Sequence, residues 1–410
     1  MAALLLLCAP ARAAQTAVLA YMSGSDLESE AAYATEDLYE MQYAGLSAAG
    51  ERTLLAMAGG AEEWAHEAMR GERAGLLRIS ESGAELLETR RARNMGSART
   101  LEEFLAFGAE HAPAERYILV LWGHGSGPFG LCYDENYDDD LTLDELRSAL
   151  QTAERRGQRI DAVIFDACSM GCADALYALD GLTDYAVMSQ ASTVGTGGRY
   201  NEWLAAPGEN AREACLRFAQ RYIETTRHGA FSDFSSISVL DVSRAGGMRA
   251  AVEALCAELS AALDRDSGAV LDALEALWPE SYVDDDGMFD ARAVCDAFEE
   301  IAPAACAALR TELERAVLLN EVSGMPEGAL CGLSIVLPGP DAELNDALRE
   351  LYLPRMRDSA HARLVVQLST ALRGRTKGGG LFGLLGDLLG GLSADSPDYT
   401  QIWQGLRPSA

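Results

Sequence analysis

The stretch YILVLWGHGSG, residues 117–127, decides the fold class of this chain. Its first six residues, 117–122, are apolar without a break, which is typical of a β-strand buried on both faces of a sheet. The run leads directly into His124, which has a glycine on either side. Glycine leaves the space beside the backbone open, so the pattern predicts room for a ligand next to this histidine.

A second stretch, DAVIFDACSMGC at residues 161–172, repeats the arrangement with different chemistry. An apolar run is followed here by Asp166 and Cys168. Between the two runs, residues 141–156 have the amphipathic spacing of a helix. Strand–helix–strand units are right-handed with parallel strands, so the carboxyl ends of both strands should share one sheet edge. Ligands of open α/β sheets bind at that edge.

Further short apolar runs alternate with amphipathic stretches along the chain. They cover residues 16–22, 53–58, 75–79, 185–189, 236–242 and 332–337. This alternation predicts an α/β fold, in which a mostly parallel sheet is flanked by helices on both faces. Helix formers dominate residues 244–325, which predicts a helical insertion before the last strand of a domain spanning 15–370. Residues 371–410 form a Gly/Leu-rich tail.

Composition and the first residues indicate the setting in which the protein works. Residues 1–14 have the apolar run and small-residue cleavage site of a signal peptide shortened at its start. We therefore expect a secreted, periplasmic or cell-surface protein, and favour cleavage over a lipid anchor at Cys8. The net charge of −30 excludes nucleic acid as a partner, and no apolar stretch is long enough to span a membrane.

An imidazole and a thiol at one sheet edge can act together as a base and a nucleophile. The thiolate is the attacking species, and a neighbouring imidazole takes its proton. We expect His124 and Cys168 to form this pair. The backbone N–H groups of Gly125 and Cys168 would then hold the oxyanion that develops on an attacked carbonyl.

The segments WGHG and DAC resemble the His-Gly and Ala-Cys signatures of the clostripain-like cysteine peptidases, in the caspase-like superfamily. Segments YMSGSDLES (21–29), NMGSARTLEEFLAF (94–107) and GLSIVLP (332–338) are similar to that family as well. The resemblance implies a caspase-like three-layer sandwich, protein or peptide substrates, and no required cofactor. It also implies His124 as general base, Cys168 as nucleophile, and Asp166 as the acidic floor of a pocket for Arg or Lys before the scissile bond.

The segment SQASTVGTGGRY, residues 189–200, departs from the family pattern. We expect Ser189 and Thr196 to line the substrate pocket, and Thr196 stands where the family has a second pocket carboxylate. The preference for a basic residue is therefore expected to be altered. A secreted binding or adhesion protein, which keeps the fold but has lost catalysis, is the alternative that this segment favours.

An acidic loop leaves a metal site open as a further possibility. Asp134, Asn136, Asp138 and Glu145 fall at ligand positions of a calcium-binding loop, although Asp139 replaces the glycine that such a loop requires. Calcium is a weak candidate on these residues. The sequence does not indicate an oligomeric state.

Overall fold

The computed structural model describes residues 14–46, 51–69, 71, 73–91, 93–195, 197–228, 234–278 and 287–376. These residues form two compact units. The first unit contains the described residues up to 245 together with 316–332, and the second contains those of 246–315 and from 333 onward. The predicted signal peptide, Cys8 and nearly all of the predicted tail lie outside the described residues.

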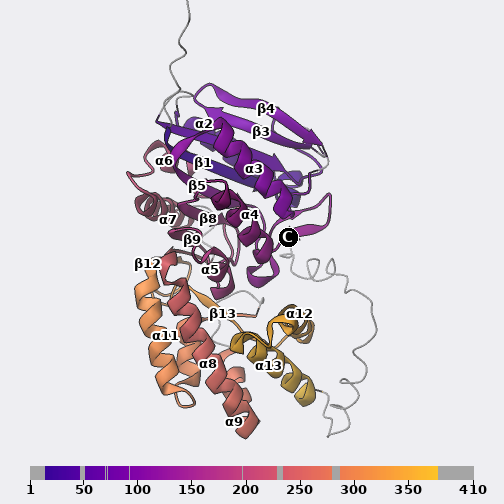
Figure 1. Cartoon of the computed structure of the whole chain (residues 1–410), viewed down its shortest axis with the longest axis vertical. Helices are drawn as coiled ribbons and strands as arrows, with labels where there is room; N and C mark the ends of the chain where they lie inside the picture. The colour runs from indigo at the N-terminus through magenta and orange to yellow at the C-terminus, as the bar shows by residue number, and fades with distance from the viewer. Residues whose placement is uncertain are drawn as a thin grey trace, which may run out of the picture. The chain divides into compact units, whose positions relative to one another are not determined.

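The first unit is built on a nine-stranded sheet with the order β12-β10-β9-β8-β5-β1-β2-β3-β4. Its strands are β1 (Ala14–Ser23), β2 (Arg52–Gly59), β3 (Arg73–Ser80), β4 (Gly83–Arg91), β5 (Ala114–Trp122), β8 (Ala162–Asp166), β9 (Tyr185–Met188), β10 (Ser235–Asp241) and β12 (Val317–Ser323). The central strands, from β9 through β8, β5 and β1 to β2, are parallel. The outer strands pair antiparallel. The expected mostly parallel sheet is therefore confirmed for the centre of the fold (Figure 1).

Helices cover both faces of this sheet and make a three-layer sandwich. One face carries α2 (Tyr33–Tyr43), α6 (Tyr200–Ala205) and α7 (Ala211–His228), and the other carries α3 (Ala98–His111), α4 (Leu143–Arg155) and α5 (Ala173–Leu179). The alternation within β1 explains the layers. Val18 and Ala20 belong to the apolar cluster beneath α2, α6 and α7. Tyr21 points the other way and packs on Phe104 of α3, with ring centroids 5.9 Å apart.

The second unit is mainly helical. It contains α8 (Ala245–Arg265), α9 (Ser267–Leu277), α10 (Ala291–Phe298), α11 (Pro303–Ala316), α12 (Ala342–Tyr352) and α13 (Ala360–Thr376). A two-stranded sheet of β11 (Met288–Asp290) and β13 (Ser334–Val336) accompanies them.

Three expected boundaries differ from the structure. The run 332–337 was expected to be the last strand of the main sheet, but β13 pairs with β11 instead. The helical insertion was expected to extend to residue 325, whereas 317–323 form β12 at the edge of the main sheet. An edge strand is only half covered, so it tolerates the Asn and Glu that hide its strand pattern. Finally, α13 continues through Thr376, beyond the expected start of the tail.

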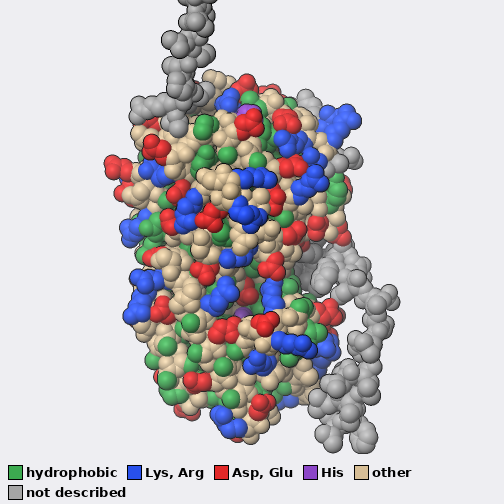
Figure 2. Space-filling view, viewed as in Figure 1, with side chains coloured by type: hydrophobic (Ala, Val, Ile, Leu, Met, Phe, Trp, Pro, Cys, Tyr) green, Lys and Arg blue, Asp and Glu red, His purple; other side chains and the backbone are tan. Residues whose placement is uncertain are grey.

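The surface carries charges of both signs. Figure 2 shows Asp and Glu side chains interspersed with Arg side chains over the visible face. Among the described residues, no helix has the length and apolar character needed to cross a bilayer.

Replacing Leu19 by Ala should destabilise the fold, because this side chain is fully buried in the central strand β1. We expect a loss of about 2–5 kcal/mol in the free energy of unfolding, measured by urea denaturation followed by circular dichroism. Leu86→Ala is the control, since Leu86 is 42% exposed, and should change stability by about 0.5 kcal/mol or less. Equal losses for both variants would contradict the packing described here.

Candidate active site

The topology brings the segments that carry His124 and Cys168 to the same edge of the sheet. β5 and β8 are parallel neighbours, and Trp122 at the end of β5 lies opposite Asp166 at the end of β8. The N–H of Gly123 donates a hydrogen bond to the Asp166 carbonyl at 3.2 Å. His124 and Cys168 each follow these paired strand ends by two residues, so they start from the same level of the sheet.

The two loops are in direct contact through Gly125. A Cβ atom at this position would lie 2.4 Å from the Cys168 carbonyl oxygen and 3.0 Å from the Ala167 Cβ. No side chain fits there, so the glycine is required by the packing of one main chain against the other. This reason for the glycine differs from the sequence-based expectation, which was room for a ligand.

Gly125 pairs with Leu131 in a short antiparallel bridge. The N–H of Gly125 makes none of the hydrogen bonds of this bridge. The bridge is made by its neighbours: the Cys132 N–H donates to the His124 carbonyl at 2.8 Å, and the Ser126 N–H donates to the Gly130 carbonyl at 3.0 Å. Alternate residues of such a bridge direct their N–H groups away from the partner strand. This geometry suits an N–H that binds an oxyanion.

A third strand end supplies a carboxylate to the histidine. Asp26 lies in α1 (Ser25–Ser29), directly after β1, and its Oδ1 is 2.7 Å from Nε2 of His124. The hydrogen bond to His124 lowers the pKa of Asp26 to about 2, against the opposing effect of burial. Asp26 is therefore ionised at neutral pH and accepts the Nε2 proton, which leaves Nδ1 as the basic nitrogen of a neutral ring.

Sequence reasoning did not find Asp26. The available signal was its position, because Asp26 lies four residues after the apolar run 16–22, and His124 lies two residues after the run 117–122. Three neighbouring strand ends, those of β1, β5 and β8, thus contribute Asp26, His124 and Cys168 to one edge of the sheet.

The surroundings of Cys168 differ from those of the other cysteines that the structure describes. Cys168 is partly exposed, whereas the others are buried. Its Sγ accepts a hydrogen bond from the Thr193 N–H at 3.2 Å and lies 3.4 Å from the Thr193 hydroxyl. An N–H directed at sulfur stabilises a thiolate. Cys172, four residues later, is buried completely, and burial raises the pKa of its thiol, which makes it unreactive.

Of the three residues predicted to line the substrate pocket, the structure describes Asp166 and Ser189. Asp166 is buried, and its Oδ2 accepts a hydrogen bond from the Tyr200 hydroxyl at 2.6 Å. Burial raises the pKa of Asp166 to about 6. Ser189 is fully buried, and its hydroxyl donates to the Ala191 carbonyl at 2.7 Å, which stabilises the loop after β9. Its place in the substrate pocket stays a prediction. Thr196 lies outside the described residues.

The acidic loop forms a hairpin of β6 (Leu131–Asp134) and β7 (Asp139–Leu141). The carboxylate of Asp134 accepts two backbone N–H groups, one of them from Asn136, and Asp138 accepts a tyrosine hydroxyl. Glu145 completes the capping box at the start of α4. Among the residues that the structure describes, no group of three or more His, Cys, Asp or Glu side chains is arranged to hold a metal ion. Calcium binding stays an untested prediction.

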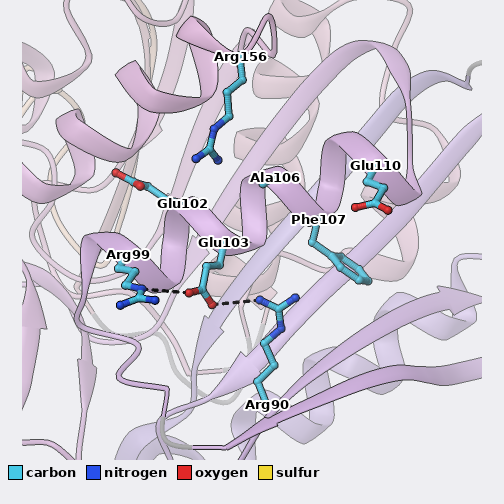
Figure 3. A pocket seen from close by; sticks show the side chains of 8 residues that line it. All are labelled: Arg90, Arg99, Glu102, Glu103, Ala106, Phe107, Glu110 and Arg156. Carbon is cyan, nitrogen blue, oxygen red and sulfur yellow. Dashed lines mark hydrogen bonds and ion pairs between the residues drawn. The ribbon is translucent and has the colours of Figure 1, made fainter.

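A pocket of about 340 Å³ lies over α3 and is distinct from this edge of the sheet. It is lined by Arg90, Arg99, Glu102, Glu103, Ala106, Phe107, Glu110 and Arg156. Glu103 pairs with Arg90 at 3.0 Å and with Arg99 at 3.2 Å (Figure 3). None of the residues at the strand ends lines this pocket.

Comparison with known proteins decides the family. The model of the clostripain family, peptidase family C11, matches residues 20–312. The chain belongs to the clostripain family. Its members are cysteine peptidases, and the chain is accordingly a cysteine endopeptidase, as the resemblance implied.

Solved structures of C11 proteases share the fold of this clostripain-family chain. A secreted C11 cysteine protease from Bacteroides thetaiotaomicron, in complex with an irreversible peptide inhibitor, is 18% identical, with a TM-score of 0.61 over 80% of this chain and 93% of that one. An inactive zymogen C11 protease from Parabacteroides distasonis is 21% identical, with a TM-score of 0.62 over 83% and 98%. The B. thetaiotaomicron protease iotapain is 15% identical, with a TM-score of 0.63 over 86% and 99%. No curated protein matches the sequence.

Replacing Asp26 by Asn should lower kcat for peptide hydrolysis and leave KM nearly unchanged. The amide can present its N–H to Nε2 and favour the wrong tautomer of His124, while the peptide-binding groups are untouched. We expect kcat to fall by about tenfold or more, within the roughly 10²–10⁴-fold that a general base contributes. Glu30→Gln removes an exposed carboxylate close by in sequence and should have no effect. A change in KM alone would argue that Asp26 does not position His124.

Proposed function

We propose that Cys168 is the nucleophile of this peptidase and that His124 is its general base, held in orientation by Asp26. The observation that carries the proposal is the 2.7 Å bond between His124 and Asp26, at the sheet edge where Gly125 packs on the Cys168 main chain. A histidine whose one nitrogen is bound by a carboxylate has its other nitrogen oriented for proton transfer.

The reaction proceeds through an acyl-enzyme. Nδ1 of His124 takes the thiol proton, and the Cys168 sulfur forms a bond to the peptide carbonyl carbon. The carbonyl oxygen becomes an oxyanion held by the N–H groups of Gly125 and Cys168. When this intermediate collapses, the C–N bond breaks and the leaving amine takes the proton from His124. Water then attacks the thioester, which releases the carboxylic acid and restores the thiol.

We infer that Asp166 selects a basic side chain, arginine or lysine, before the scissile bond. Asp166 precedes the nucleophile by two residues and is buried, and a buried carboxylate favours a long cationic side chain over a neutral one. Secretion is inferred from the signal-like residues 1–14 and is supported by the description of a C11 relative as secreted. The alternative function, binding without catalysis, is favoured only by the loss of acids from residues 189–200.

A peptide carrying arginine and a reactive ketone should label the full chain covalently at Cys168. Labelling should disappear in Cys168→Ala and persist in Cys172→Ala, because the Cys172 thiol is buried and its pKa is raised. The measurement is the mass of the intact protein before and after treatment, followed by identification of the modified peptide. An unlabelled wild-type chain, or labelling that survives in Cys168→Ala, would contradict the proposed nucleophile and favour the binding protein.

A further inference from the structure

Asp37 is a buried carboxylate whose hydrogen bonding is incomplete. It lies on α2 and is only 1% exposed. Its Oδ2 accepts a hydrogen bond from the indole N–H of Trp122 at 2.7 Å, but its Oδ1 has no hydrogen-bond partner among the described residues. A buried carboxyl group with an unsatisfied oxygen is costly, so it calls for a physical explanation.

Asp37 shares its surroundings with Asp166. A Cβ atom on Gly197 would lie 2.6 Å from Asp37 Oδ2 and 3.1 Å from Asp166 Oδ2, so both oxygens lie close to the main chain at Gly197. Burial, and then repulsion from Asp166, raise the pKa of Asp37 well above its usual range. Both carboxyls therefore hold their protons to a higher pH than an ordinary aspartate does.

Neither carboxylate forms an ion pair with a described residue. Arg199 is the arginine closest in sequence to Gly197, and it pairs with Glu202 at 3.2 Å. The other acidic group near Asp166 is Glu40, whose carboxylate accepts the Tyr200 N–H at 2.9 Å. Among the described residues neither carboxyl has a cationic partner, and binding a cation from outside would lower both pKa values and favour the charged carboxylates.

We propose that Asp37 and Asp166 together bind the guanidinium group of a substrate arginine, with Asp37 as a second specificity-determining residue. The inference rests on the proposed function and deepens it. A guanidinium has five N–H donors in one plane, so it can bridge two carboxylates and satisfy the unpaired Oδ1 of Asp37 as well. A lysine ammonium is a compact charge without this fork, so arginine is the better fit.

The loop after β9 connects this pair to the nucleophile. Its Thr193 contacts the sulfur of Cys168, and its Gly197 covers the two carboxylates. A side chain next to a bond attacked by Cys168 therefore extends toward Asp166 and Asp37 along this loop. Because Asp37 is nearly fully buried, entry requires the main chain at Gly197 to shift.

The test compares Asp37→Asn with wild type in the full chain, using peptides that differ only in Arg, Lys or norleucine before the scissile bond. Asparagine keeps the size of the side chain and can still accept the Trp122 N–H, but it removes the charge. We expect kcat/KM for the Arg peptide to fall by about ten- to a hundredfold, mainly through KM, with the norleucine peptide unchanged. Glu36→Gln, an exposed change on the same helix, should leave all three values unchanged.

The pH dependence gives a second readout that a purely structural Asp37 would not move. Asp166 is ionised above its pKa of about 6 and neutral below it, so the preference for Arg over norleucine should decline as the pH falls through 6. The pKa of Asp37 is raised as well, in part by the charge of Asp166, so ionisation of Asp37 should add to the Arg preference as the pH rises further. This additional rise should be absent in Asp37→Asn.

The outcomes separate this inference from the proposed function. If Asp166→Asn loses the Arg preference and Asp37→Asn keeps it with an unchanged pH profile, Asp37 has no part in specificity and the inference is wrong.

If wild type cleaves no peptide, the proposed function fails. The inference is then tested by fluorescence anisotropy, which measures the binding of labelled Arg and norleucine peptides. Binding that depends on Arg in wild type and is lost in Asp37→Asn supports it. Equal binding of both peptides by wild type overturns it.

Discussion

The close approach of two backbones, Gly125 against the carbonyl of Cys168, is the constraint on which the rest of the site depends. It exists because β5 and β8 are parallel neighbours with Trp122 opposite Asp166, so the residues that follow leave the sheet together. A side chain at position 125 would force the two loops apart. The central strands are buried on both faces, and a close-packed core holds their ends in place. Rigid strands thereby position the reactive side chains that the loops carry.

The sheet also explains how polar groups from distant parts of the sequence meet. Asp26, His124 and Cys168 follow β1, β5 and β8, which are adjacent in the sheet. The acidic pair is assembled differently, since Asp166 ends a strand and Asp37 comes from the helix that covers one face. Both arrangements depend on burial, which strengthens each electrostatic interaction in the site. In the proposed function, catalysis and specificity share the carboxyl edge of the parallel strands, to which α2 adds Asp37.

Much of this could be predicted from the sequence, because apolar runs and right-handed crossovers determine which strand ends meet. The proximity of the 124 and 168 segments follows from that rule alone. Asp26 and Asp37 were missed because a single carboxylate has no periodic signal, and its partner is set by the tertiary fold. The bond of the Ser189 hydroxyl within its own loop was also not predictable, because a short serine side chain bonds nearby main-chain groups in many loop conformations. The strand at 317–323 was missed because it lies at the sheet edge, where polar residues are tolerated.

The central claim is that the thiol of Cys168 is activated by the imidazole of His124. Its most direct test is the rate of alkylation of Cys168 by iodoacetamide between pH 5 and 9, in wild type and in His124→Ala, with the modified residue identified by mass spectrometry. The account predicts that the wild-type thiol reacts well below the pKa of about 8.5 of a free cysteine, and that the variant reacts only near that value. Identical pH profiles for the two proteins would contradict it.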